Sequence, residues 1–260
     1  MRESVDLHMM LRMQLASIAG ARLRADSRIA TGHAALDAAL GRGLARGRVH
    51  ELFAAEGDDG PSAAGFAAML ALRTVGRAPV FWLRTDDAER RGGLIHMPGL
   101  IELGGDPDSL VLGQAPDVKA LLKVAADAAR CPGLGALIVE AHGKCPALDL
   151  TASRRLALAV EQSGVTLLML RLGAEPAPSA ADTRWAVSAA PSQVLEANAP
   201  GAPTFDIELL RRRSGPAGMR WRLEWNRDRL TFTEPALPGA VVPLPSRRPN
   251  APDAGLRLSA

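Results

Sequence analysis

The sequence predicts an α/β fold, in which a parallel, doubly wound sheet is extended by antiparallel strands toward the C-terminal end. Between residues 49 and 170, short apolar segments alternate with segments of helical periodicity, which is typical of a parallel sheet covered by helices. Beyond Arg171, apolar and polar residues alternate with a period of two, which indicates antiparallel strands. The expected parallel strands are 49–53, 80–83, 110–112, 136–139 and 165–170, and the expected helices between them are 61–75, 118–129 and 151–162.

The chain is expected to divide into three segments. Residues 1–27 hold an amphipathic helix over 4–25, because apolar residues recur there at helical spacing. Residues 28–234 form the α/β core, which begins with a short helical face at Leu36, Ala39 and Leu40. Residues 235–260 are rich in Pro, Ala, Gly and Arg, and we expect this tail to be disordered.

Turn residues and alternation place the remaining elements. Pro61 suits the first position of its helix, since the missing N–H would be unpaired there anyway. The segment Ser214–Gly218 has hairpin composition and separates two alternating segments. The expected antiparallel strands are 184–188, 205–211 and 219–225.

Composition indicates a globular protein with one sizeable core. Of 260 residues, 47% are hydrophobic and 23% are charged, and no apolar run approaches the roughly 20 residues of a membrane span. Charged residues interrupt the N-terminal segment from Arg2 to Arg28, so we expect a cytoplasmic protein. The two cysteines, Cys131 and Cys145, form no CxxC pair, and we expect neither a disulfide nor a metal site.

Positive charge is concentrated at the two ends of the chain, although the net charge is only +3. Residues 211–260 contain ten Arg and four acidic residues. Such a surface suits nucleic acid or an acidic partner, or it is simply a solvated face, and the sequence leaves both readings open. The candidate partner-binding residues are Arg211, Arg212, Arg213, Trp221, Trp225, Arg247 and Arg248.

Two ordered blocks of sequence resemble the core of the RecA recombinase family, and the resemblance covers roughly residues 28–225. The second block runs from Leu103 to Gln114. The first block includes Thr31-Gly32, Leu36-Asp37, Leu40-Gly41, Gly43-Leu44 and Gly47-Arg48-Val49 with Glu51.

Within these proteins the chain most resembles the ImuA family of SOS-inducible mutagenesis proteins, which is distantly similar to the division inhibitor SulA. The segments Ala180–Trp185 and Leu209–Gly215, followed by Trp221 and Trp225, carry this resemblance. It implies a role in error-prone translesion synthesis. The implied partners are an ImuB-type Y-family polymerase homologue and an accessory DnaE-type polymerase subunit, and RecA itself is a further candidate.

The phosphate-binding loop of this fold is degenerate. A P-loop needs G-x-x-x-x-G-K-[ST] between a strand and a helix, and Pro61 stands where the lysine would be. This removes an ammonium group and a backbone N–H donor from the phosphate cradle. Asp58 and Asp59 add carboxylates where phosphates would lie. We therefore expect no cofactor. The degenerate nucleotide site would consist of Glu56, Gly57, Asp58, Asp59, Gly60, Pro61, Ser62, Asp86 and Glu140.

Two acidic residues match ATPase positions of the RecA family. Asp86 corresponds to the water-activating carboxylate, and Glu140 corresponds to the Walker B carboxylate. Glu140 either holds Mg²⁺ through water or simply ends a buried strand beside the old cleft. The spans matching the DNA-binding loops, 142–150 and 172–182, are short or lack basic residues, which argues against RecA-like DNA binding.

Three functions remain open from the sequence. The first is a non-catalytic RecA-like adaptor of a mutagenic translesion complex. The second is a residual ATP-dependent switch or ATPase, with Mg²⁺–nucleotide near Ser62, Asp86 and Glu140. The third is a SulA-like inhibitor of cell division.

Overall fold

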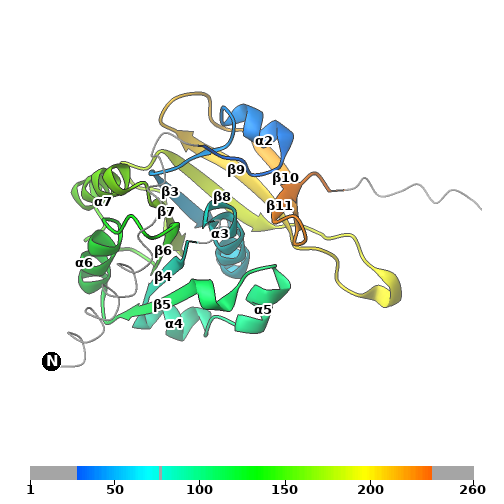
Figure 1. Cartoon of the computed structure of the whole chain (residues 1–260), viewed down its shortest axis with the longest axis horizontal. Helices are drawn as coiled ribbons and strands as arrows, with labels where there is room; N and C mark the ends of the chain where they lie inside the picture. The colour runs from blue at the N-terminus through cyan, green and yellow to red at the C-terminus, as the bar shows by residue number, and fades with distance from the viewer. Residues whose placement is uncertain (1–27, 76–77, 236–260) are drawn as a thin grey trace, which may run out of the picture.

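The computed structural model describes residues 28–75 and 78–235. They form a nine-stranded sheet, with strand order β11-β10-β9-β8-β3-β7-β6-β4-β5, and a separate two-stranded sheet of β1 and β2 (Figure 1). The predicted α/β fold with antiparallel C-terminal strands is confirmed. The helix expected at 4–25 and the tail 236–260 lie outside the described residues.

The parallel part of the sheet is built around β3. This strand pairs in parallel with β7 on one side and with β8 on the other, and β6, β4 and β5 continue outward from β7. Every strand predicted here from an apolar segment is present. The bounds are β3 Val49–Ala54, β4 Val80–Thr85, β5 Leu110–Ala115, β6 Ala136–His142, β7 Thr166–Leu172 and β8 Thr183–Ala189.

The direction of β8 differs from the expectation. Alternation suggested an antiparallel strand, but β8 runs parallel to β3 and only its other edge is antiparallel, against β9. Side-chain alternation reports which face is buried and carries no information on strand direction. The antiparallel extension then continues outward, with β9 Thr204–Arg212, β10 Arg220–Asn226 and β11 Thr231–Thr233.

Helices cover both faces of the parallel sheet. Helix α3 packs on one face, and α6 and α7 pack on the other, forming a separate core cluster there (Figure 1). The side chain of Phe66 in α3 lies between the rings of Phe205 and Phe232, with ring centroids 5.6 and 5.1 Å apart. The bounds are α3 Gly60–Val75, α6 Val118–Ala128 and α7 Leu150–Ser163, each within one residue of the predicted helices.

The first RecA-like block forms a compact turn and a short helix, α2 (Ala34–Ala39). The Asp37 carboxylate accepts hydrogen bonds from the backbone N–H of Thr31 at 2.8 Å and of Gly32 at 3.1 Å. Strands β1 (Arg28–Ile29) and β2 (Leu44–Ala45) pair beside it. At Gly43 a Cβ would lie 2.2 Å from the Ile29 carbonyl oxygen, so only glycine fits.

Several short elements were not predicted. Helix α4 (Asp86–Gly92) is mostly charged, and α5 (Met97–Glu102) contains Pro and Gly, so neither shows an apolar helical stripe. Both are held by side-chain N-caps, Thr85 for α4 and His96 for α5. The 3₁₀ turns η1 Gly57–Asp59, η2 Pro107–Ser109 and η3 Glu196–Asn198 and the strands β1, β2 and β11 were also missed.

A buried polar chain crosses the base of the sheet at β3 and β8. The indole N–H of Trp185 donates to Thr183 Oγ1 at 2.7 Å, and Thr183 in turn donates to Nδ1 of His50 at 2.8 Å. Nε2 of His50 donates to the Ala45 carbonyl at 2.8 Å, which fixes the neutral tautomer. Burial lowers the pKa of His50 from 6.5 to about 4.

We expect stability to fall as the pH drops from 6.5 to 4, because the folded protein resists protonation of His50 and the unfolded chain does not. The contribution is present in full above pH 6.5, is lost as the pH falls to about 4, and amounts to about 3 kcal/mol. Urea unfolding at pH 7.5, 5.5 and 4 measures it. His50→Gln should lose much less stability over this range, and an equal loss in both proteins would contradict the assignment.

Candidate functional site

The loop between β3 and α3 is closed by its own acidic residue. Oδ2 of Asp59 accepts from the backbone N–H of Glu56 at 3.1 Å, and Oδ1 accepts from the backbone N–H of Ala189 at 2.8 Å. The carboxylate therefore ties the loop to the end of β8. A loop N–H that lies in the phosphate-binding segment already has an internal partner.

The first turn of α3 also differs from the expected helix start. The helix begins at Gly60, one residue before the predicted start, and Pro61 is exposed as its second residue. Because proline has no N–H, it adds no donor to the first turn. Asp58 is exposed in η1, and Ser62 is half-buried. The loop lies between β3 and α3, where the sequence predicts the degenerate phosphate-binding loop, and residues 55–62 include no Lys or Arg.

The Glu140 carboxylate is buried between two donors from the neighbouring strand. Oε2 accepts from the indole N–H of Trp82 at 3.0 Å, and Oε1 forms an ion pair with Arg84 at 3.2 Å. The Arg84 guanidinium also donates to the carbonyls of Ala88 and Gly93, at 3.0 and 2.8 Å. This arrangement favours the structural reading of Glu140 over the Mg²⁺-binding one.

The two acidic residues that match ATPase positions lie in different environments. Glu140 is 2% exposed, whereas Asp86 is exposed at the start of α4. His142 follows Glu140 at the end of β6, with its Nε2 3.8 Å from the Glu140 carboxylate. Burial lowers the pKa of His142 below its usual value, although Glu140 acts in the opposite direction. Of these two effects on the imidazole, burial is the larger.

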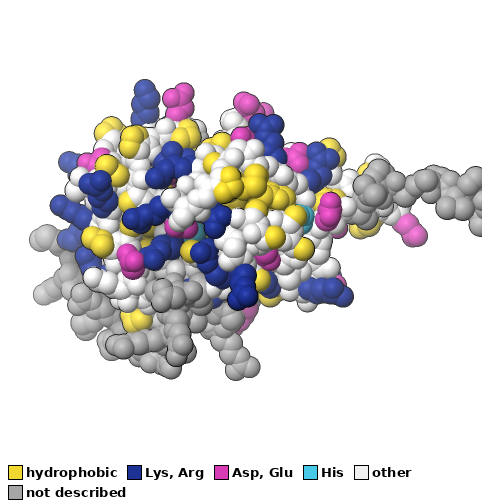
Figure 2. Space-filling model, turned by 90° about the horizontal axis from the view of Figure 1, so that it is seen from above, with side chains coloured by type: hydrophobic (Ala, Val, Ile, Leu, Met, Phe, Trp, Pro, Cys, Tyr) yellow, Lys and Arg dark blue, Asp and Glu magenta, His cyan; other side chains and the backbone are white. Residues whose placement is uncertain are grey.

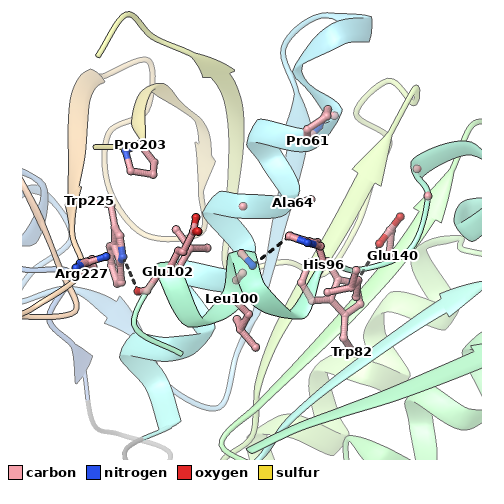
Figure 3. Close-up of a pocket in the computed structure, with 18 of the residues that line it drawn as sticks. Pro61, Ala64, Trp82, His96, Leu100, Glu102, Glu140, Pro203, Trp225 and Arg227 are labelled. Atoms are coloured by element: carbon pink, nitrogen blue, oxygen red, sulfur yellow. Dashed lines mark hydrogen bonds between the residues drawn. The ribbon is translucent and has the colours of Figure 1, made fainter. Parts of the chain in front are cut away.

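A cavity of about 1270 Å³ adjoins the loop and extends along α3 (Figure 3). It reaches from Glu140 and Trp82 at one end to Trp225 at the other, with Leu100 of α5 beside it. Further residues of its lining come from four segments, 91–96, 99–103, 200–203 and 224–228. Sequence reasoning placed a nucleotide site at only one end of this space.

The candidate partner-binding residues divide into several kinds. Trp225 is 1% exposed and belongs to the core, and its indole donates to the Leu103 carbonyl at 2.9 Å. Arg212 donates to the carbonyls of Ala39 and Leu40 and so joins β9 to α2. Trp221 is half-buried against Trp185, with ring centroids 6.1 Å apart.

Arg211 also has an internal role, since it donates to the carbonyls of Ser179 and Ala181, while Arg213 is exposed. Arg247 and Arg248 lie outside the described residues. Seen from above, the half of the molecule that carries α7 shows many Lys and Arg side chains (Figure 2). Two of the three clustered arginines at 211–213, Arg211 and Arg212, thus have internal hydrogen-bond partners.

The second span that matches a RecA DNA-binding loop is fixed against the sheet. Arg184 pairs with the buried Glu51 carboxylate at 2.8 Å and donates to the Ala177 carbonyl and to Ser179 Oγ. Hydrogen bonds from Arg184 of β8 therefore hold the segment between β7 and β8 in place. Among the described residues no group of three or more potential metal ligands occurs, and no described helix is long and apolar enough to cross a membrane. Neither cysteine forms a disulfide.

Comparison with known proteins assigns the family. The chain is 34% identical over 203 residues to Protein ImuA of Caulobacter vibrioides strain NA1000 / CB15N, with 73% of both chains covered. The chain belongs to the ImuA family. Protein ImuA of C. vibrioides strain ATCC 19089 / CIP 103742 / CB 15 matches to the same extent, and no protein-family model matches. The RadB recombinase crystal structure aligns with a TM-score of 0.53 at 13% identity, over 79% of this chain and 99% of that chain, which shows a shared fold.

In this ImuA-family chain, three features of the site escaped sequence reasoning. The contact of Asp59 with Ala189 and the distal part of the cavity depend on segments far apart in the sequence, so no local pattern signals them. The contact of Asp59 with Glu56 is local, because the two residues form a capping box three positions apart. Arg84 did leave a signal, because a charged residue within an apolar strand needs a buried partner. Glu140 on another apolar strand was the matching charge.

We expect Asp59→Ala to lower the free energy of unfolding by about 1–2 kcal/mol, because two backbone N–H groups lose a carboxylate acceptor. The matched control is Asp58→Ala, which removes an exposed neighbouring carboxylate and should change stability by less than about 0.5 kcal/mol. Urea unfolding of the two variants measures both values. Equal effects at the two positions would show that Asp59 does not brace the loop.

Proposed function

We propose that this protein is a non-catalytic RecA-like adaptor of an error-prone translesion complex in the SOS response. Membership of the ImuA family supports involvement in DNA-damage mutagenesis. The observation that carries the non-catalytic part is the loop, where Pro61 replaces the cation of the phosphate cradle and Asp59 engages the backbone N–H of Glu56.

Electrostatics supports the proposed loss of nucleotide binding. A phosphate near Asp58 or Asp59 would meet like charge, and one such pair at about 4 Å costs about 1 kcal/mol in water and about 4 kcal/mol at a partly shielded surface. A triphosphate would meet several pairs. Arg84 does not offset them, because Glu140 already neutralises it.

The proposed partners follow from the family. They are an ImuB-type Y-family polymerase homologue and an accessory DnaE-type polymerase subunit, and RecA itself is a further candidate. An adaptor of this kind would work in the cytoplasm and associate with the nucleoid when bound to its partners.

Nucleotide-independent capture of the polymerase homologue is the expected result of a pull-down with the purified full chain. The reaction is run with and without ATP and Mg²⁺, with RecA as a second bait. Equal capture in both conditions supports the adaptor. Capture that requires ATP would favour the residual switch instead, and no capture would contradict the proposal.

ATP with Mg²⁺ should leave the thermal unfolding midpoint unchanged. A nucleotide at 100 times its Kd would stabilise the folded state by about 2.7 kcal/mol, which a thermal scan detects readily. Turnover is assayed in parallel for the wild type, Glu140→Gln and Asp86→Asn. Because Glu140 belongs to a buried ion pair, the exposed Asp86 provides a variant that leaves this pair intact. Turnover that either substitution abolishes would contradict the non-catalytic assignment.

A further inference from the structure

The cavity beside α3 is too large for an ordinary small-molecule site. Its volume of about 1270 Å³ exceeds the roughly 300–1000 Å³ of typical ligand pockets. Two of its lining residues, Leu94 and Leu195, are 80% and 59% exposed. Leu94 lies between α4 and α5, and Leu195 lies in the projecting loop between β8 and β9 (Figure 1). Exposed leucines on two segments that border an open groove suit contact with a macromolecule better than enclosure of a small ligand.

The floor of the groove is a row of small residues on one face of α3. Pro61, Ala64, Gly65 and Ala68 recur at helical spacing and all line the cavity. A Cβ built at Gly65 meets nothing within 4 Å, so the space above the floor is open. Small side chains on a helix surface allow a second helix to pack at the close end of the usual 8–10 Å interaxial range.

The unpaired charges of the groove lining are negative. Arg84, Arg91 and Arg227 each lie within 4 Å of a carboxylate, Arg84 of Glu140, Arg91 of Asp87 and Arg227 of Asp228. Among the described residues, Glu102 and Glu224 have no ion-pair partner.

Glu102 lines the cavity, and in the view of Figure 3 its side chain lies between those of Leu100 and Pro203. Its carboxylate complements a cationic side chain on an occupant of the groove. The apolar floor and this carboxylate together are complementary to an amphipathic segment that has an apolar face and a positive charge.

We propose that this groove binds an amphipathic helix of the adaptor's protein partner, with its apolar face on α3 and a Lys or Arg beside Glu102. The inference rests on the proposed adaptor function and names the surface that would perform it. In helix-in-groove recognition the bound helix places its apolar anchors, at i, i+3, i+4 and i+7, into a hydrophobic groove, and the small side chains on α3 leave room for such anchors.

Two substitutions and two matched controls test the groove. Leu94→Asp places a charge on its apolar rim, and Glu102→Lys reverses its unpaired charge. Leu158→Asp, at a 59% exposed leucine of α7, and Asp108→Lys, at an exposed carboxylate, make the same changes outside the cavity. All four positions are exposed, so folding should be retained, as circular dichroism and urea unfolding would verify.

The readout is the Kd for the ImuB-type polymerase homologue used in the pull-down. Each groove variant should bind at least tenfold more weakly than wild type, and each control should bind within twofold. Wild-type capture with unchanged groove variants would overturn the groove proposal and leave the adaptor function standing. Failure of wild-type capture would overturn both.

Hydrogen exchange on the wild-type complex provides a second measurement that needs no variant. The partner should slow exchange in residues 91–103 and leave α7 unchanged. Protection confined to other segments would overturn the proposal. Self-association of the wild type that is lost in Leu94→Asp, without any effect on the partner's Kd, would overturn it in favour of a second copy of this chain.

Discussion

The buried ion pair between Arg84 and Glu140 is the constraint on which the site depends. It joins neighbouring strands β4 and β6, and Arg84 extends the connection to α4 through the carbonyls of Ala88 and Gly93. Removing one partner of such a pair typically costs about 3–5 kcal/mol, because the other charge stays buried. The position of α4, and with it one wall of the cavity, therefore depends on this ion pair. Neither β4 nor β6 could bury its charged residue without the opposite charge on the other strand.

The same ion pair also reduces the capacity of the Glu140 carboxylate, near the end of β6, to bind Mg²⁺. A carboxylate that already accepts from Trp82 and Arg84 has fewer free lone pairs, and the Arg84 charge reduces the negative potential that attracts Mg²⁺. In the loop, the Asp59 carboxylate likewise accepts from the backbone N–H of Glu56, and it also accepts from that of Ala189 at the end of β8. Internal groups thus satisfy polar positions that a nucleotide-binding protein leaves for its ligand, which supports the proposed absence of ATP turnover.

The sequence predicted the elements whose burial is decided locally. The strands from β3 to β7 are short apolar runs, and α3, α6 and α7 have regular apolar faces, so period and length identify them. Short capped helices such as α4 and α5 are stabilised by Thr85 and His96 and by packing, which no periodicity reports. At the site, Pro61 and the acidic residues could be read from their positions in the loop. The Asp59–Ala189 contact could not, because it joins the loop to the end of a strand far along the chain. Arg84 was a readable candidate for the partner of Glu140, but only the pairing of β4 with β6 places the two side chains together.

Helix α3 packs on the core with one face and lines the groove with another, and Ala68 belongs to both. Ala63, Phe66, Ala67 and Leu70 face the core and are at most 3% exposed, whereas the cavity-lining residues are displaced from them by two positions, or about 200° around the helix. The core face holds α3 on the sheet through large aromatic contacts, and the groove face adds little to that packing because its side chains are small. Substitutions on such a surface can alter which partner it binds without disturbing the packing of α3 on the sheet. The binding function proposed for the groove therefore does not depend on the nucleotide chemistry of the loop at its end.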